Sequence, residues 1–142
     1  MTSQHCGRRA LMVLALWSGM VAPVLAQDPR TSEAQRVARE WLAWSDAGDG
    51  KATYTAASAK FKNALTVEQW EQALTTARAP YGAVKARTLT AAQPVLQAAN
   101  MPDGVYVMLL YRTNFAARDA SETVTMEREG DGVWRLVGYS IR

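Results

Sequence analysis

Hydrophobic residues recur every three or four positions between residues 34 and 77, a spacing typical of helices that bury one face. Thr31 or Ser32 can cap a first helix, and Gly48-Asp49-Gly50 ends it. A second helix is predicted over residues 51–62, and a third starts at a capping-box pattern of Thr66 and Gln69 and ends before Pro80 and Gly82. The predicted buried faces carry Ala34, Val37, Ala38, Trp41, Leu42 and Ser45 in the first helix, Tyr54, Ala57, Ser58 and Phe61 in the second, and Trp70, Ala73, Leu74 and Ala77 in the third.

From residue 83 onward the pattern changes to alternation with β-branched residues, which predicts strands. Strands are expected at about 84–89, 105–115, 122–129 and 133–141. The first strand is expected to resume at 95–96, and Pro94 restricts that part to an edge or a bulge. The predicted fold class is α+β, with three N-terminal helices packed on one face of a curved, about four-stranded antiparallel sheet. The segment 105–115 is apolar nearly throughout, so both of its faces are expected to be covered. Three helices cannot cover both faces, which leaves the outer face for a homodimer or as an exposed patch.

The N-terminal 26 residues have the three parts of a secretory signal. Arg8 and Arg9 are basic, residues 10–21 are apolar but shorter than the about 20 residues that a membrane span needs, and residues 24–26 form a small-x-small cleavage site. We expect a cleaved signal peptide (1–26), one α+β domain (27–142) and no membrane span after cleavage. The expected location is periplasmic or secreted by the Sec route; the arginine pair also raises twin-arginine export, but such pairs are common in Sec signals.

Composition excludes several kinds of chemistry. The only histidine, His5, and the only cysteine, Cys6, lie in the signal, so residues 27–142 can form no disulfide, thiol nucleophile, Ser-His-Asp triad or Cys/His zinc site. The formal charge is +3 before cleavage and +1 after it, because Arg8 and Arg9 are removed, and the charges are interleaved. This argues against a nucleic-acid partner. The segment 46–50 lacks the ligands of a calcium loop, and no glycine-rich phosphate loop is present, so no metal or cofactor is expected.

Three sets of residues resemble the DUF4019 family, small exported bacterial proteins of unknown function. Their order and spacing cover about residues 33–141. The resemblance implies a cone-shaped, NTF2-like or cystatin-like α+β fold, and it supplies no catalytic residues. Tyr54 stands where the family often has another aromatic residue. The matching residues are Trp41-Leu42, Asp46-Ala47-Gly48, Tyr54, Ser58 and Phe61-Lys62; Thr66 to Trp70, Arg78 to Gly82 and Arg87; and Gly104 to Val107, Phe115, Glu122, Val124-Thr125 and Gly132 to Tyr139.

Eight aromatic residues could line a pocket between helices and sheet, where small apolar ligands bind. Their helical and strand spacing favours the alternative that they form the core. These residues are Trp41, Tyr54, Phe61, Trp70, Tyr81, Tyr106, Phe115 and Trp134.

Arg78 and Arg87 could clamp an anion where the third helix joins the sheet, because a guanidinium holds a carboxylate or phosphate with two parallel hydrogen bonds. The alternative is structural: Arg78 would bind the last helical carbonyls, and Arg87 would pair with Asp46 or Glu122.

Asp46 and Glu122 are the carboxylates that could serve as a base in a half-buried pocket, with Tyr54 or Tyr106 stabilising an oxyanion, as in a ketosteroid-isomerase-like enzyme. The spacing does not require this, since Asp46 can equally end a helix and Glu122 can be a cross-strand charge. We therefore name no catalytic residue.

The function expected from the sequence is a non-catalytic module of the bacterial envelope that binds a small apolar or anionic ligand. The alternatives are the isomerase-like enzyme and a protein–protein interaction subunit without a pocket. The candidate binding residues are Trp41, Asp46, Tyr54, Trp70, Arg78, Arg87, Tyr106, Glu122 and Trp134.

Overall fold

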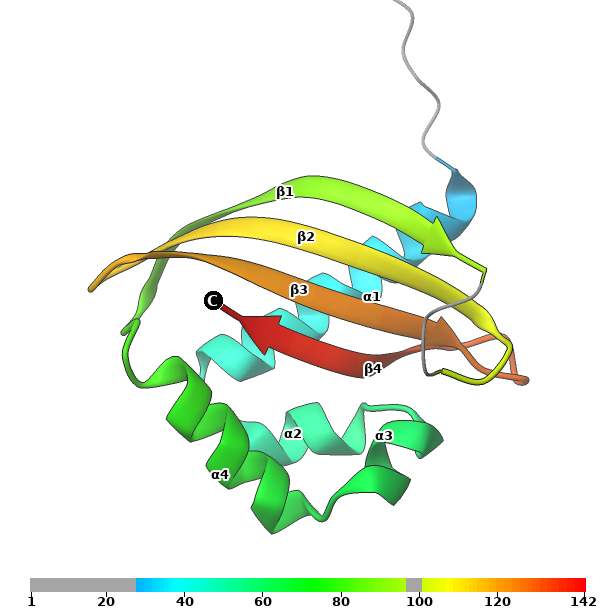
Figure 1. The fold of residues 1–142 in the computed structure, drawn as a ribbon, viewed down its shortest axis with the longest axis horizontal. Coiled ribbons are helices and arrows are strands. Elements are labelled where there is room, and N and C mark those ends of the chain that lie inside the picture. The colour runs from blue at the N-terminus through cyan, green and yellow to red at the C-terminus, as the bar shows by residue number, and fades with distance from the viewer. Residues whose placement is uncertain (1–27, 97–100) are drawn as a thin grey trace, which may run out of the picture.

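In the computed structural model, which describes residues 28–96 and 101–142, helices come first and strands follow (Figure 1). The strands form one antiparallel sheet in the order β1-β2-β3-β4. The described residues thus have the predicted α+β organisation, while the predicted signal peptide lies outside them. The helices are α1 (Pro29–Asp46), α2 (Gly50–Thr55), α3 (Ala59–Ala64) and α4 (Val67–Arg78), and the strands are β1 (Val84–Val95), β2 (Val105–Phe115), β3 (Asp119–Arg128) and β4 (Trp134–Ile141).

The prediction of three helices is wrong, because the described chain has four. The segment predicted as one helix over 51–62 is divided into α2 and α3. Between them, the Ser58 amide donates a hydrogen bond to the Leu136 carbonyl of β4 at 2.8 Å, and the Ser58 hydroxyl caps α3 by accepting from the Phe61 amide at 3.2 Å. Pairing with the sheet edge therefore interrupts a segment that is helical by its own periodicity.

Other element ends differ from the prediction by a few residues. The predicted cap of α1 at Thr31 or Ser32 is wrong. Asp28 caps this helix, because its carboxylate accepts from the Arg30 amide at 2.9 Å, and Pro29 lies in the first turn. The capping box of Thr66 and Gln69 is confirmed. Strand β1 continues without a break through Pro94, and it is an edge strand, as that proline requires.

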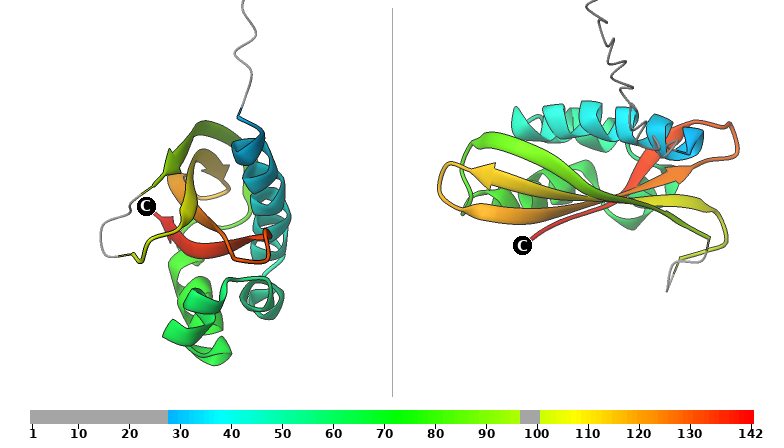
Figure 2. Two further views of the ribbon diagram at one scale, coloured as in Figure 1. Left: turned by 90° about the vertical axis from the view of Figure 1, so that its right-hand side faces the viewer. Right: turned by 90° about the horizontal axis from the view of Figure 1, so that it is seen from above.

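The sheet has one face covered by helices and one open face. Helix α1 crosses the inner face of the curved sheet, and α2, α3 and α4 gather beyond the β4 edge (Figures 1 and 2). Along β2, Val107, Leu109 and Tyr111 are buried on the inner side, whereas Met108 and Leu110 on the outer side are only half-buried. The helices of one chain thus cover the inner face of this strand, and coverage of its outer face by a second subunit stays a prediction.

The core lies between α1, α4 and the inner face of the sheet, and aromatic rings fill much of it. The rings of Trp41 and Trp70 have centroids 6.2 Å apart, and the ring of Phe61 lies edge-on to Trp70 at 4.9 Å. Both indole N–H groups donate to Thr53, one to its carbonyl at 3.0 Å and one to its hydroxyl at 2.9 Å. These hydrogen bonds remove the penalty of burying polar ring atoms and fix α2 against α1 and α4.

Candidate functional site

Four charged side chains meet where α1 and α4 end and β1 begins. Asp46 is the last residue of α1, and Arg78 is the last residue of α4. Arg87 comes from β1 and Glu122 from β3, both on the inner face of the sheet. Gly82 has φ of 76°, which allows the sharp turn that carries the chain from α4 back into the sheet. Residues 46, 78, 87 and 122 are called the charge network below.

The charge network is neutral and closely paired. Arg87 holds Asp46 with both terminal nitrogens, at 2.7 Å and 2.9 Å, and donates from Nε to Glu122 at 2.7 Å. Arg78 donates to Asp46 at 2.7 Å and to Glu122 at 3.2 Å. Burial disfavours the charge on Arg87, but its hydrogen bonds to Asp46 and Glu122 outweigh burial and raise its pKa. Each arginine is therefore shared between both carboxylates.

Glu122 is the most enclosed member of the network, with no exposed side-chain surface. One oxygen accepts from Arg78 and from the Tyr139 hydroxyl, the latter at 2.6 Å. The other accepts from Arg87 and from the Thr113 hydroxyl at 2.5 Å. Burial, together with the neighbouring Glu122 charge, raises the pKa of Tyr139, so the phenol stays a donor. Both carboxylate oxygens are thus occupied by donors within the protein.

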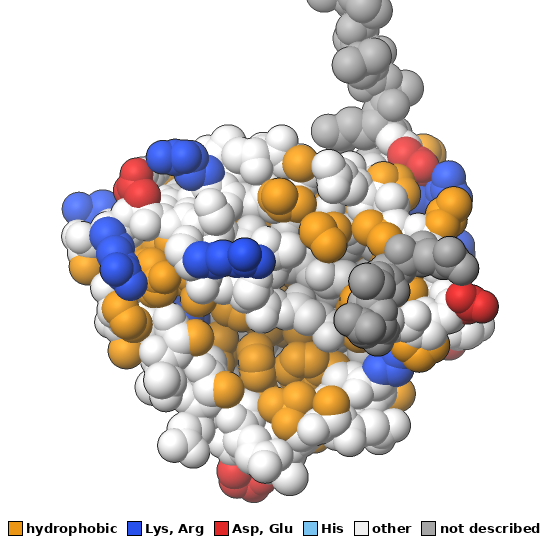
Figure 3. All heavy atoms as spheres, in the orientation of Figure 1, with side chains coloured by type: hydrophobic (Ala, Val, Ile, Leu, Met, Phe, Trp, Pro, Cys, Tyr) orange, Lys and Arg blue, Asp and Glu red, His pale blue; other side chains and the backbone are white. Residues whose placement is uncertain are grey.

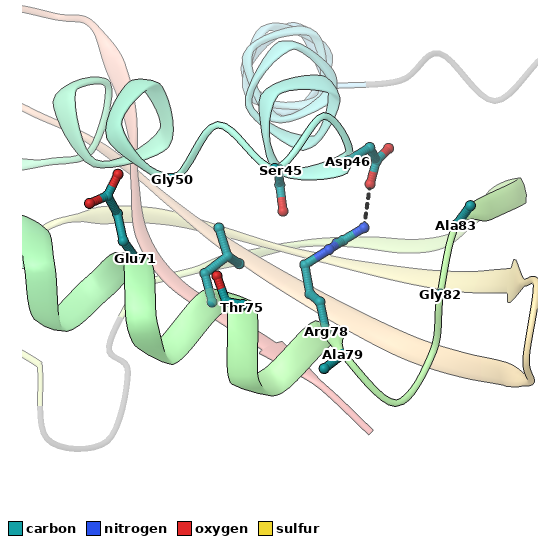
Figure 4. A pocket seen from close by; sticks show the side chains of 11 residues that line it. Ser45, Asp46, Gly50, Glu71, Thr75, Arg78, Ala79, Gly82 and Ala83 are labelled. Carbon is teal, nitrogen blue, oxygen red and sulfur yellow. Dashed lines mark hydrogen bonds and ion pairs between the residues drawn. The ribbon is translucent and has the colours of Figure 1, made fainter.

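A first cavity, of about 430 Å³, opens beside the charge network between the end of α1, the start of α2 and α4. Ser45, Asp46, Glu71, Thr75 and Arg78 contribute side chains to its lining. Figure 4 shows the Ser45 hydroxyl pointing into this space, with the Asp46–Arg78 pair closing one end. Ser45 is 2% exposed, and its oxygen has no hydrogen-bond partner among residues 28–96 and 101–142.

A second cavity, of about 350 Å³, lies on the other side of Asp46, between α1 and the strands β1 and β2. Tyr111, from the inner face of β2, contributes a buried hydroxyl that has no hydrogen-bond partner within the described residues. Asp46 lines both cavities, while Arg78 lines the first and Arg87 the second. The charge network is therefore a wall between two cavities. The second cavity is lined by Arg39, Leu42, Ala43, Asp46, Arg87, Leu89 and Tyr111.

Of the nine candidate residues, the structure brings together the four charged ones. The structural alternative for Arg87 is confirmed, because it pairs with both Asp46 and Glu122. Arg78 binds the same two carboxylates instead of the last carbonyls of its helix. One signal in the sequence could have indicated Arg39, because the spacing of Arg39, Leu42, Ala43 and Asp46 places these four residues on one side of α1. The site residues that the sequence analysis did not indicate are Arg39, Ser45, Glu71, Thr75, Tyr111, Thr113 and Tyr139.

The five aromatic candidates lie elsewhere. Trp41, Trp70 and Trp134 are buried in the core, as their spacing favours. The Tyr54 hydroxyl donates to the carbonyls of Lys62 and Leu65, at 3.1 Å and 2.9 Å, and so ties the end of α3 to α2. Tyr106 points to the outer side of the sheet, where its hydroxyl donates to the Pro102 carbonyl at 2.8 Å and accepts from Lys60 at 3.0 Å. None of these five lines the two cavities described above.

Residues 28–96 and 101–142 contain no group of three or more acidic, histidine or cysteine side chains arranged to hold a metal ion. No helix in the same part of the chain is long and apolar enough to cross a membrane.

The fold and the site define an α+β protein in which a neutral charge network, built around the buried Glu122, separates two open cavities. The family model described as "Protein of unknown function (DUF4019)" matches residues 37–139, and the chain belongs to this family. The resemblance drawn from the sequence is therefore confirmed. Among the curated proteins and the solved structures that were compared, none matches the chain.

Proposed function

We propose that the protein is an exported, non-catalytic module of the bacterial envelope that binds a small molecule beside the charge network. The carrying observation is a pair of buried hydroxyls, Ser45 Oγ and Tyr111 OH, each without a partner in the described part of the chain and each lining a cavity. A buried polar group without a hydrogen bond costs about 1–3 kcal/mol. A ligand that hydrogen-bonds to either hydroxyl would recover that free energy, which supports binding at these two cavities.

The charge network supports a binding role over catalysis. A general base needs a free lone pair within reach of the substrate proton. Both oxygens of Glu122 already accept two hydrogen bonds each, and both oxygens of Asp46 are held by arginines. The side chains instead form a rigid polar wall, which suits orientation of a ligand and not removal of a proton. Tyr54 and Tyr106, the oxyanion donors of the enzyme alternative, lie away from both carboxylates.

Export and assembly are proposals that rest mainly on the sequence. The basic, apolar and small-residue parts of segment 1–26 support Sec-dependent export to the periplasm or medium. Helix α1 crossing the concave side of a curved sheet supports a cone-shaped, NTF2-like fold.

Hydrophobic side chains on the open face of the sheet, among them the half-buried Met108 and Leu110, support a homodimer through this face. Figure 3 shows hydrophobic side chains on this side of the molecule between scattered lysines and arginines.

Native mass spectrometry of the chain recovered from periplasm, compared with the denatured sample, tests the proposed function. The expected native mass exceeds the denatured mass by a small molecule that is lost on unfolding. A bare protein that also gains no thermal stability from a periplasmic small-molecule extract would contradict ligand binding, since a bound ligand must stabilise the native state. A bare dimer in that experiment would favour the interaction subunit, and a bare monomer that the extract does not stabilise would contradict both roles.

A further inference from the structure

The second cavity combines a positive end with apolar walls. On α1, Arg39, Leu42, Ala43 and Asp46 follow the i, i+3, i+4, i+7 spacing of one helix face, and this face looks onto the inner side of β1 and β2. Leu89 and Tyr111 are paired across the two strands, so they lie side by side beneath it. Leu42, Ala43 and Leu89 give the cavity its apolar surface.

Arg39 supplies a charge that nothing in the described chain neutralises. It is exposed at the mouth of the cavity and forms no ion pair within residues 28–96 and 101–142, whereas Arg36, on another side of the same helix, pairs with both Glu33 and Glu40. Arg87 and Asp46 belong to the neutral network, so the cavity carries one unbalanced positive charge. Arg87 also uses three of its five N–H groups on the network, which leaves two to donate.

The Tyr111 hydroxyl lies at the buried end of the same cavity. The residue is 5% exposed, and its oxygen has no hydrogen-bond partner in the part of the chain that the structure describes. Burial raises the pKa of Tyr111, and the positive charges of Arg39 and Arg87 partly oppose this rise. The phenol is thus a neutral donor in a cavity that Arg39 and Arg87 also line.

We propose that the cavity between α1 and strands β1 and β2 binds a small organic monocarboxylate. Arg39 would pair with the carboxylate, Tyr111 would donate a hydrogen bond to it, and Leu42, Ala43 and Leu89 would contact the hydrocarbon part. This inference rests on the proposed ligand-binding function and names the class of ligand. A monoanion fits better than phosphate, because one positive charge is unbalanced and the Asp46 carboxylate lines the same wall.

Isothermal titration calorimetry with hexanoate tests the assignment, and hexanamide and inorganic phosphate serve as comparison probes. The full exported chain, recovered from periplasm and dialysed, should bind one hexanoate molecule. It should bind either comparison probe at least about tenfold more weakly, because hexanamide lacks the negative charge and phosphate lacks the hydrocarbon part. Arg39→Gln should weaken hexanoate binding by about tenfold or more. Tyr111→Phe should weaken it several-fold while leaving the thermal midpoint unchanged or higher, since it removes an unpartnered buried hydroxyl.

Arg36→Gln is the matched control, because it removes the same charge from another face of the same helix, and it should leave hexanoate affinity unchanged. Equal affinities of Arg39→Gln and Arg36→Gln, or equal binding of hexanoate and phosphate, would overturn the assignment. If native spectra contain a co-purified molecule that hexanoate neither displaces nor joins, ligand binding stands and the monocarboxylate assignment fails. If no small molecule co-purifies and neither hexanoate nor the extract binds, both fail.

Discussion

Replacing Glu122 by glutamine should be among the most destabilising conservative changes in the protein. The side chain has no exposed surface, and its loss of charge leaves Arg78 and Arg87 sharing Asp46 alone. Removing one partner of a buried ion pair costs about 3–5 kcal/mol, because the remaining charge stays buried without compensation. Against a total stability of about 5–15 kcal/mol, this is a large fraction.

Urea unfolding followed by tryptophan fluorescence measures the effect, because Trp41 and Trp70 lie in the core. With a slope of about 1–3 kcal/mol per molar urea, Glu122→Gln should lower the midpoint by at least about 1 M. Glu33→Gln is the control, since Glu33 also pairs with an arginine but its side chain is 52% exposed; its midpoint should not change measurably.

A double-mutant cycle separates pairing from general damage to the core. Arg78→Gln combined with Glu122→Gln restores neutrality, so the double variant should lose clearly less stability than the two single variants add up to. Additive losses, or a Glu122→Gln midpoint equal to that of the wild type, would refute the reasoning that the network is held by mutual compensation.

Two further predictions concern stability away from the network. Arg135 lowers the pKa of Asp131 to about 2, so the ionised carboxylate stabilises the folded state above the unfolded pKa of 3.8 and loses this effect as the pH falls toward 2. The difference in thermal midpoint between wild type and Asp131→Asn should therefore be largest above pH 4 and should vanish near pH 2. A difference that does not depend on pH would contradict this prediction. A methyl group at Gly50 would lie 2.8 Å from Glu71 Cγ, so Gly50→Ala should lower the free energy of unfolding by about 1–3 kcal/mol, measured by thermal or urea unfolding. Gly130→Ala is the control and should lower it less, because a methyl group there would meet no described atom within 4 Å. Equal losses of stability would contradict the prediction that the contact with α4 limits the space at Gly50.

Most of the fold could be predicted from periodicity because helix α1 and strands β2 and β3 bury a regular face. Strand β2, predicted over 105–115, has those same bounds, and the capping box that starts α4 is present. The break between α2 and α3 could not be predicted, because it depends on the Ser58 amide pairing with Leu136, 78 residues further along the chain. A contact of this range leaves no local signal.

The site was predicted in part, and for a physical reason. Arginines and carboxylates are conspicuous in a short chain, so Asp46, Arg78, Arg87 and Glu122 could be named from the sequence. Their shared pairing depends on the sheet register, which sets Arg87 and Glu122 on neighbouring positions of the inner face. Whether a buried hydroxyl such as that of Tyr111 has a partner is decided only by three-dimensional packing.

Amide chemical-shift mapping with ¹⁵N-labelled protein shows whether a small molecule binds between α1 and the sheet. During titration with hexanoate, we expect saturable shifts concentrated at residues 39–46, 87–89 and 111, and much smaller shifts with hexanamide. Shifts that are absent, that are confined to the open face around Met108 and Leu110, or that are matched by hexanamide would contradict it.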